Sequence, residues 1–465
     1  MTSPPTPFSA SRTPVLEYTI LALLGAAAIV MLWAEPPFIG ADELFHYQRA
    51  LQVAQGNWLS PQLGPNSWGG PIDSRAFEFL IAFLKKYTGQ APLTWDQAQT
   101  LADTFSTRDS GWVSVPFPST AAFSPLAYLP QAAGIAAAAW AGFDLMAQTY
   151  AGRLANLVCY LGLLGLIVHL LPCGRRGVLL ATTLPGMLHV AGTLSADPLN
   201  VTLPLLLATL VLRLRTNSIR ARLALATIAA LCLALALLKP ILVIVTPIVL
   251  LIPRTAFRTP TRAWVFRLAC IAAAALIAAL WSAAYPFVPG EYWKTGADPA
   301  AMLARFVTHP IDALGFLVRS LQAWSWLWWQ DADSRFGGHA PPYLIISGPA
   351  WADAAMLAAI VLAIPANPSP RPDKPAAAAL AILAIAYALL VIAAFTIGFT
   401  PPDGDTVQGV QGRYFLLPFA LAALATAALA LRIPSRLSLG ATLLAATLSL
   451  GLLVEAIPHL YAMRG

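Results

Sequence analysis

The sequence VLEYTILALLGAAAIVMLWAEPPFIGADELFHYQRA, residues 15–50, joins an apolar run to a charged segment. Residues 15–33 are almost uniformly apolar and long enough to cross a bilayer as one helix. The run ends without a small-residue cleavage pattern before Glu35, so we expect a retained first span and not a removed signal peptide. Two prolines and a glycine then break the helix, and a new helix is expected to begin near Asp42.

The composition of the whole chain agrees with a membrane location. The chain has 465 residues, of which 58% are hydrophobic and only 11% are charged, whereas about 25% of the residues of a soluble globular protein are charged. The net charge is +7, but no basic motif of a nucleic-acid binder occurs, so no nucleic-acid partner is expected. The four cysteines lack CxxC spacing, which argues against zinc ribbons and a disulfide framework.

Ten further apolar runs follow the first. They occupy residues 150–171, 177–194, 199–212, 223–238, 240–252, 264–284, 345–364, 376–398, 414–431 and 437–453. The sequence therefore predicts an all-α polytopic membrane protein with about eleven transmembrane helices, folded as a single domain over residues 1–465.

The distribution of basic residues predicts the orientation of the chain. With a cytoplasmic N-terminus, the short inner loops contain Arg175, Arg176, Arg213, Arg215, Arg220, Arg222, Arg254, Arg258, Arg262, Arg267, Arg371, Lys374, Arg432 and Arg436, as the positive-inside rule requires. Residues 34–149 and 285–344 then form two large outer loops bearing interfacial helices. The apolar stretch 124–142 is read as one of these helices, because counting it as a span would invert every later loop.

The second outer loop is rich in tryptophan. Trp324, Trp326, Trp328 and Trp329 precede Gln330 and Asp331. The pattern is typical of an interfacial anchoring belt, and the alternative is a stacking surface for sugar rings or an entry for a lipid tail. The acid pairs Asp331 with Asp333 and Asp403 with Asp405 do not by themselves predict a metal site.

Charged residues gather just after the first span. On a helix that begins near Asp42, His46 and Arg49 follow at i+4 and i+7 and share its face, with Glu43 about 100° around. One carboxylate could act as a general base, oriented by His46 or Arg49. The alternative is that Asp42 and Glu43 cap the helix and favour its positive end. A divalent metal is compatible with these residues, but the set is incomplete as a site, so no metal or other cofactor is predicted.

These residues carry a family resemblance. The pattern Pro-Pro-x-x-Gly-x-Asp-Glu-x-x-His-x-x-Arg-Ala, together with AGRLAN at 151–156, LPG at 184–186, SAD at 195–197 and GVQGRYF at 409–415, resembles the domain-of-unknown-function-2142 family of bacterial membrane proteins. That family is similar in layout to the GT-C glycosyltransferases, in which an acid of the first outer loop is catalytic. The resemblance therefore implies Asp42 first, and Glu43 second, as the catalytic residue.

The resemblance also implies a reaction. A GT-C-like enzyme would transfer a sugar, with inversion, from a polyprenyl-phosphate donor to a cell-envelope glycan or lipid acceptor, such as a polysaccharide or lipopolysaccharide. The site would face the periplasm from the bacterial inner membrane, in contact with membrane lipids. One alternative is a transporter or flippase of lipid-linked glycans, which would require ionisable groups at the bilayer midplane. The other alternative is a polysaccharide polymerase or ligase.

The anionic leaving group of such a reaction needs cationic donors nearby. Arg49, Arg153, Lys239 and Arg413 are the candidates, and Tyr414 and Asp197 are further candidate substrate-binding residues. Lys239 interrupts an apolar region, 223–253, that would be about 46 Å long as one helix, so the chain must turn there. The alternative interpretations are that Lys239 and Arg413 only anchor the chain to lipid headgroups and that Asp197 only caps a helix.

Overall fold

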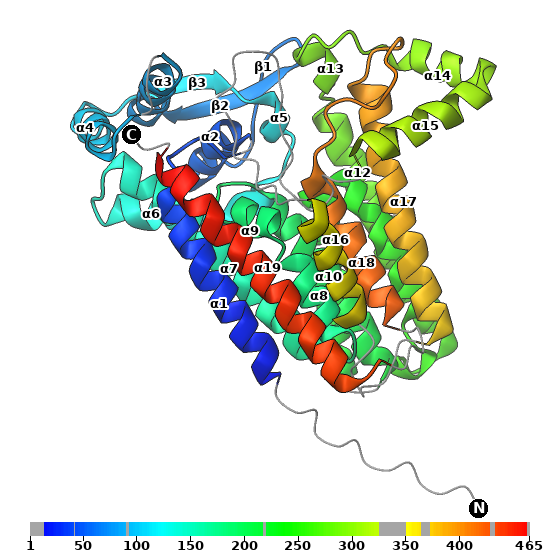
Figure 1. The fold of residues 1–465 in the computed structure, drawn as a ribbon. Helices are drawn as coiled ribbons and strands as arrows, with labels where there is room; N and C mark the ends of the chain where they lie inside the picture. The colour runs from blue at the N-terminus through cyan, green and yellow to red at the C-terminus, as the bar shows by residue number, and fades with distance from the viewer. Residues whose placement is uncertain are drawn as a thin grey trace, which may run out of the picture.

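The computed structural model describes residues 14–40, 42–89, 93–216, 220–324, 350–363, 373–427 and 433–462. Figure 1 shows a bundle of long helices with a layer of short helices and strands at one end. The chain is mostly helical, as the sequence predicts for a polytopic membrane protein.

In the described part of the chain, seven helices are long and apolar enough to cross a membrane. They are α1 (Val15–Ala34), α7 (Leu145–Leu170), α10 (Asp197–Arg215), α11 (Ala221–Leu238), α12 (Pro260–Ala284), α17 (Lys374–Gly398) and α19 (Ser435–Ala462). Each contains at least 18 residues, which gives a length of about 27 Å or more, close to the thickness of the hydrocarbon core. These helices correspond to seven of the eleven predicted runs.

The other four apolar runs form shorter helices in the described part of the chain. They are α8 (Arg175–Thr182) with α9 (Pro185–Ala191), the 3₁₀ helix η2 (Pro240–Leu251), α16 (Ala350–Ala363), and η5 (Gly412–Phe415) with α18 (Leu416–Thr426). Pro185 explains the break between α8 and α9, because the residue before a proline avoids the helical region. The beginning of the run 345–364 lies outside the described residues.

The first large loop contains helices and, unexpectedly, a small sheet. Its helical elements are α2 (Glu43–Ala54), α3 (Ser74–Gly89), α4 (Trp95–Ser106), α5 (Pro118–Ala121), η1 (Pro125–Tyr128) and α6 (Leu129–Trp140). The strands β1 (Gln62–Gly64), β2 (Ser67–Asp73) and β3 (Trp112–Pro116) form an antiparallel sheet in the order β1-β2-β3. The mostly helical chain agrees with the all-α prediction, and this small sheet is an addition that the prediction did not include. The residues 124–142 form η1 and α6, and α6 is too short to cross a bilayer.

A close backbone approach explains why the strand β2 contains glycine. A side chain on Gly69 would meet the backbone oxygen of Val115 at 1.9 Å, and one on Gly70 would meet the side chain of Gln52 at 2.1 Å. The glycines thus let β2 pack against β3 on one side and α2 on the other. They also remove the alternation of apolar and polar residues by which a strand is recognised in a sequence.

The second large loop contains α13 (Pro289–Tyr292), α14 (Pro299–Thr308) and α15 (Pro310–Trp324). It lies at the same end of the bundle as the first loop (Figure 1), and Asn66 of the first loop donates a hydrogen bond to the backbone oxygen of Val288 at 3.0 Å. We call this end the loop end. The predicted tryptophan belt at Trp326, Trp328 and Trp329 and the acid pair Asp331 and Asp333 lie outside the described residues.

Basic residues gather at the opposite end, which we call the basic end. Arg176 lies 3.1 Å from Glu17 near the start of α1, and Arg215 at the end of α10 pairs with Asp373 just before α17. The 3₁₀ helix η3 (Arg254–Ala256) joins η2 to α12 at this end. The basic loops and the two large loops therefore lie at opposite ends of the bundle, as the sequence predicts.

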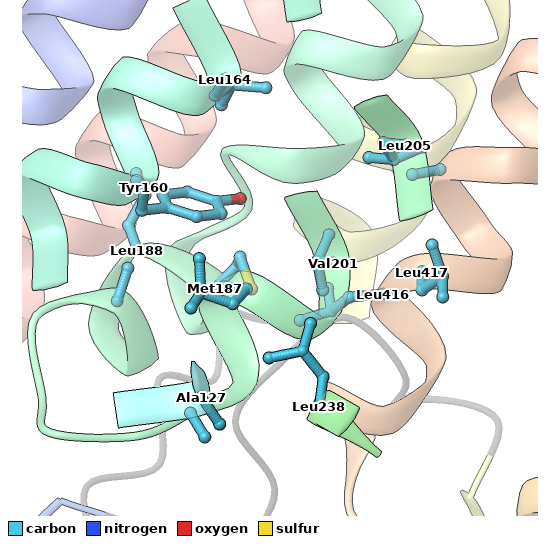
Figure 2. Close-up of a cluster of buried hydrophobic side chains, with 14 of the residues drawn as sticks. Ala127, Tyr160, Leu164, Met187, Leu188, Val201, Leu205, Leu238, Leu416 and Leu417 are labelled. Carbon is cyan, nitrogen blue, oxygen red and sulfur yellow. The ribbon is translucent and has the colours of Figure 1, made fainter. Parts of the chain in front are cut away.

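A buried apolar cluster lies beneath the loop end (Figure 2). It is formed by side chains of η1, α7, α9, α10, the end of α11 and the start of α18, namely Ala127, Tyr160, Leu164, Met187, Leu188, Val201, Leu205, Leu238, Leu416 and Leu417. Burial of this cluster brings together three helix ends that are distant in the sequence. These ends carry Asp197, Lys239 and Arg413.

Candidate functional site

Asp42 occupies a left-handed backbone position between α1 and α2. Its φ is 56° and its ψ is 11°, a conformation that aspartate tolerates better than most residues. Asp42 is the N-cap residue of α2, but its side chain makes no capping hydrogen bond. The carboxylate is therefore not used to cap the helix and points to other partners.

Those partners form a chain of charges. Arg413 donates from Nη2 to Oδ2 of Asp42 at 2.6 Å, and its Nε lies 3.1 Å from Oδ2 of Asp197. Asn200 donates to the other oxygen of Asp197 at 3.1 Å. The Arg413 side chain is 3% exposed, whereas that of Asp42 is 32% exposed. Of these ion-paired residues, Asp42 is thus the most accessible to a ligand.

Lys239 lies where the chain turns from α11 into η2, as predicted. Its Nζ lies 4.9 Å from the ring centre of Tyr414 and 5.5 Å from that of Phe123. No described carboxylate lies within ion-pair distance of it, although Asp42 and Asp197 are close enough to attract it. The ammonium is therefore held by aromatic faces and is available to an anion.

His46 lies beside these charges, one turn into α2. Its Nδ1 is 2.8 Å from the hydroxyl of Tyr128, and its ring stacks on Phe123. The pKa of His46 is lowered to about 4, chiefly by burial; the carboxylates of Asp197 and Asp42 oppose this shift, and the charges of Arg413 and Lys239 add to it. The imidazole is consequently neutral at neutral pH.

The buried histidine predicts a pH dependence of stability. Below pH 6.5 the unfolded chain binds a proton at His46 but the folded chain does not, so folding should weaken as the pH falls from about 6.5 to about 4. The loss should reach about 3 kcal/mol at pH 4. In His46→Asn this acid-induced loss of unfolding free energy should disappear. Thermal melts in detergent at several pH values would measure the difference. An equal acid sensitivity of the two proteins would contradict the buried neutral imidazole.

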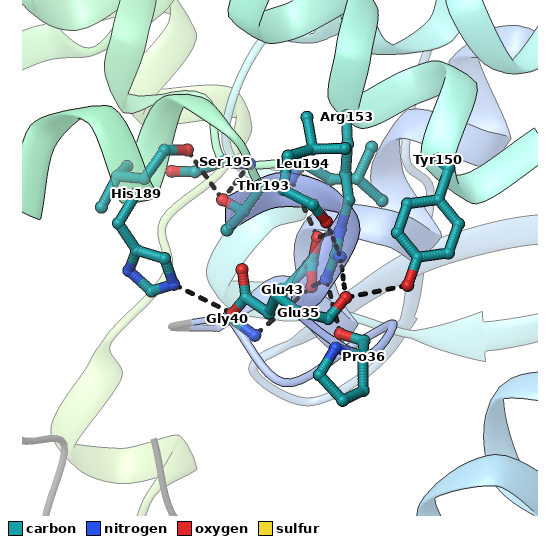
Figure 3. A network of polar contacts seen from close by, with 12 residues as sticks. Glu35, Pro36, Gly40, Glu43, Tyr150, Arg153, His189, Thr193, Leu194 and Ser195 are labelled. Atoms are coloured by element: carbon teal, nitrogen blue, oxygen red, sulfur yellow. Dashed lines mark hydrogen bonds and ion pairs between the residues drawn. The ribbon is translucent and has the colours of Figure 1, made fainter. Parts of the chain in front are cut away.

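Glu43 lies in a separate, fully buried network (Figure 3). Arg153 of α7 donates to it from Nε at 2.7 Å and from Nη2 at 2.5 Å. The backbone N–H groups of Leu194 and Gly40 donate to the same carboxylate at 3.1 and 3.3 Å. The side chains of Glu43 and Arg153 are 0% exposed. Four donors therefore occupy the Glu43 carboxylate, which has no surface open to a substrate.

Arg153 also fixes the segment that leads to Asp42. It donates to the backbone oxygens of Glu35 and Pro36, each at 2.8 Å, and Tyr150 donates to the oxygen of Glu35 at 2.8 Å. The Glu35 carboxylate lies 2.9 Å from Nε2 of His189 in α9. This network ties α1, α7 and α9 to the turn before α2 (Figure 3) and so sets the position of Asp42.

Arg49 does not join the charged cluster. It is completely buried and donates to Gln52 and to the backbone oxygens of Trp58 and Phe123. These bonds hold the segments around Trp58 and Phe123 against α2. Asp42, His46 and Arg49 were predicted to share a helix face. Only Asp42 and His46 reach the charged cluster.

The cluster that the structure brings together consists of six predicted residues, namely Asp42, His46, Asp197, Lys239, Arg413 and Tyr414. We call these residues the loop-end site. Phe123 and Tyr128 were missed, because single aromatic residues in a long loop carry no sequence signal. Among the described residues no group of three or more His, Cys, Asp or Glu is placed to hold a metal ion.

Comparisons with known proteins place the chain in a family. No curated protein and no solved structure matches it. Residues 23–424 match a family described as "Predicted membrane protein (DUF2142)". Because this match covers most of the chain, from the first span to the end of the loop-end site, the protein belongs to the DUF2142 family of membrane proteins.

Proposed function

We propose that this protein is a membrane glycosyltransferase that moves a sugar from a polyprenyl-phosphate donor to a cell-envelope acceptor. The observation that carries the proposal is the pairing of a partly exposed carboxylate, Asp42, with a buried guanidinium, Arg413, next to the ammonium of Lys239. A reaction that deprotonates a hydroxyl and releases a phosphate needs these groups in one place.

The two cations suit the phosphate of the donor. Arg413 offers a planar guanidinium, which can grip a phosphate through two hydrogen bonds, and Lys239 has no ion pair to a described carboxylate. A phosphate bound between them would replace Asp42 as the partner of Arg413. The carboxylate would then be free to accept a proton.

Asp42 would act as the general base. Its carboxylate would take the proton of the acceptor hydroxyl while the acceptor oxygen bonds to the anomeric carbon of the sugar. The bond from that carbon to the phosphate oxygen breaks with its electron pair on the phosphate, where Arg413 and Lys239 stabilise the charge. A single displacement of this kind inverts the anomeric centre.

The arrangement of loops supports an outer-face site in the bacterial inner membrane. The basic end should face the cytoplasm by the positive-inside rule. The loop end, with Asp42 and both large loops, would then face the periplasm, where polyprenyl-linked sugars meet their acceptors.

Removal of the Lys239 charge should weaken donor binding. Because Lys239 has no described ion-pair partner, Lys239→Met leaves no carboxylate orphaned and should fold normally. A hydrogen bond to a charged group contributes about 1.5–3 kcal/mol, so the donor KM should rise about tenfold or more. Steady-state transfer assays would measure it, with the exposed Lys86 of α3 changed to Met as a matched control. An unchanged donor KM would argue against the role of Lys239.

The function can be tested without knowledge of the substrate. Lipid and glycan extracts of a deletion strain contain the unused donor and the unfinished acceptor. The purified protein, added in detergent, should attach the missing sugar to the glycan, which mass spectrometry detects. A flippase would have no effect in micelles, because no bilayer separates the reactants. A lack of transfer under conditions where the folded protein is stable would contradict the proposal.

A further inference from the structure

A cavity lies apart from the loop-end site. It has a volume of about 720 Å³ and lies between the C-terminal half of α2, the far end of the β2–β3 ladder and the turn from α6 to α7. We call it the α2 cleft. Gln55, which lines the cleft, directly follows α2. It lies about 20 Å along the helix from Asp42. Its volume is typical of a site for a small organic ligand.

Two exposed aromatic side chains line the α2 cleft. Trp112 at the start of β3 is 65% exposed, and Phe143 after α6 is 59% exposed. Gly142, which also lines the cleft, has a φ of +79°, a conformation that a side chain would strain. The fixed glycine turn sets the position of Phe143. Exposed aromatic rings of this kind offer flat apolar faces against which the C–H groups of a sugar ring can stack.

The polar groups of the cleft are held in place by one another. Arg75 pairs with Asp73 at 2.6 Å, and the backbone N–H of Asp73 donates to the side-chain oxygen of Gln55 at 3.1 Å. The amide N–H groups of Gln55 have no described partner. Fixed donors and acceptors beside aromatic faces suit a ligand that carries many hydroxyl groups.

The charges of the lining select the class of ligand. Asp73 and Asp144 carry two negative charges and Arg75 carries one positive charge, so a phosphate would meet a net negative surface. The ion pair of Asp73 with Arg75 and the carboxylate of Asp144 disfavour a lipid chain, because its binding would remove water from these charges. We propose that the α2 cleft binds an oligosaccharide, and that this oligosaccharide is the acceptor. The acceptor role rests on the proposed transferase function, whereas the binding of an oligosaccharide does not.

The test uses the full-length protein in lipid nanodiscs on a printed array of bacterial surface oligosaccharides, followed by a titration of the best binder. Trp112→Ala should weaken its binding at least tenfold, and Trp112→Phe should keep most of the affinity because a flat ring remains. Trp140→Ala is the matched control, because Trp140 is 91% exposed and does not line the cleft. It should bind as the wild type does.

Two results would overturn the inference. One is the absence of binding to every oligosaccharide on the array, and the other is binding that Trp112→Ala leaves unchanged. The proposed transferase function can be wrong even if the α2 cleft binds an oligosaccharide. If Trp112-dependent binding persists in a protein that transfers no sugar to the deletion-strain glycan, the oligosaccharide site stands and its acceptor role falls.

Discussion

Replacing Arg153 with methionine is expected to lower the free energy of unfolding by about 3–5 kcal/mol, because it leaves the buried carboxylate of Glu43 without its counter-charge. Both side chains are 0% exposed, so no water can compensate for the loss. The substitution also removes the hydrogen bonds to the backbone of Glu35 and Pro36. The turn that positions Asp42 should loosen together with the fold.

The surface pair Arg108 and Glu78 provides the control. Its two side chains are each 49% exposed, and an exposed pair contributes about 0–1 kcal/mol. Thermal melts of the purified proteins in detergent should therefore show a large drop for Arg153→Met and a small one for Arg108→Met. Equal melting temperatures for the two variants would contradict the structural role given to the Glu43 network.

The second large effect concerns catalysis. Asp42→Asn is expected to reduce sugar transfer at least about 10²-fold, the usual contribution of a general base. The fold should be retained, because the asparagine oxygen can still accept the hydrogen bond from Arg413 and the side chain is partly exposed. Transfer in single-turnover assays, corrected for the amount of folded protein, measures the effect.

The neighbouring acid should behave differently. Glu43→Gln removes the charge that faces Arg153 inside the fold, so its loss of activity should accompany a loss of folded protein. Asp42→Asn should lose activity at a normal melting temperature. If Glu43→Gln melted like the wild type and yet transferred no sugar, the division between a base at Asp42 and a positioning residue at Glu43 would be wrong.

Much of the helix arrangement is predictable from the sequence, because span length is a simple physical requirement. The helix α1 follows from one apolar run, and the turn at Lys239 follows because residues 223–253 are too long for one span. The short helices formed by the runs 177–194 and 240–252 were less predictable. Both runs are apolar in the sequence, and the breaks that shorten their helices are visible only in the folded bundle.

The different surroundings of Asp42 and Glu43 could not be predicted from the two residues themselves. The two residues are adjacent and equally acidic, and the partners that distinguish them, Arg153 and Arg413, lie far along the chain. The sheet of the first loop was hidden for a local reason, since Gly69 and Gly70 interrupt the strand pattern. Sequence patterns report local preferences, whereas these features depend on distant contacts.

The assignment of Asp42 as the general base is tested most directly by mass spectrometry of envelope glycans from a deletion strain that carries Asp42→Asn at wild-type membrane levels. This strain is expected to lack the same sugar as the deletion strain. A strain with Asp403→Asn, a change of an exposed acid in a loop, should restore the sugar. Restoration of the glycan by Asp42→Asn to the wild-type level would contradict the assignment of Asp42 as the base.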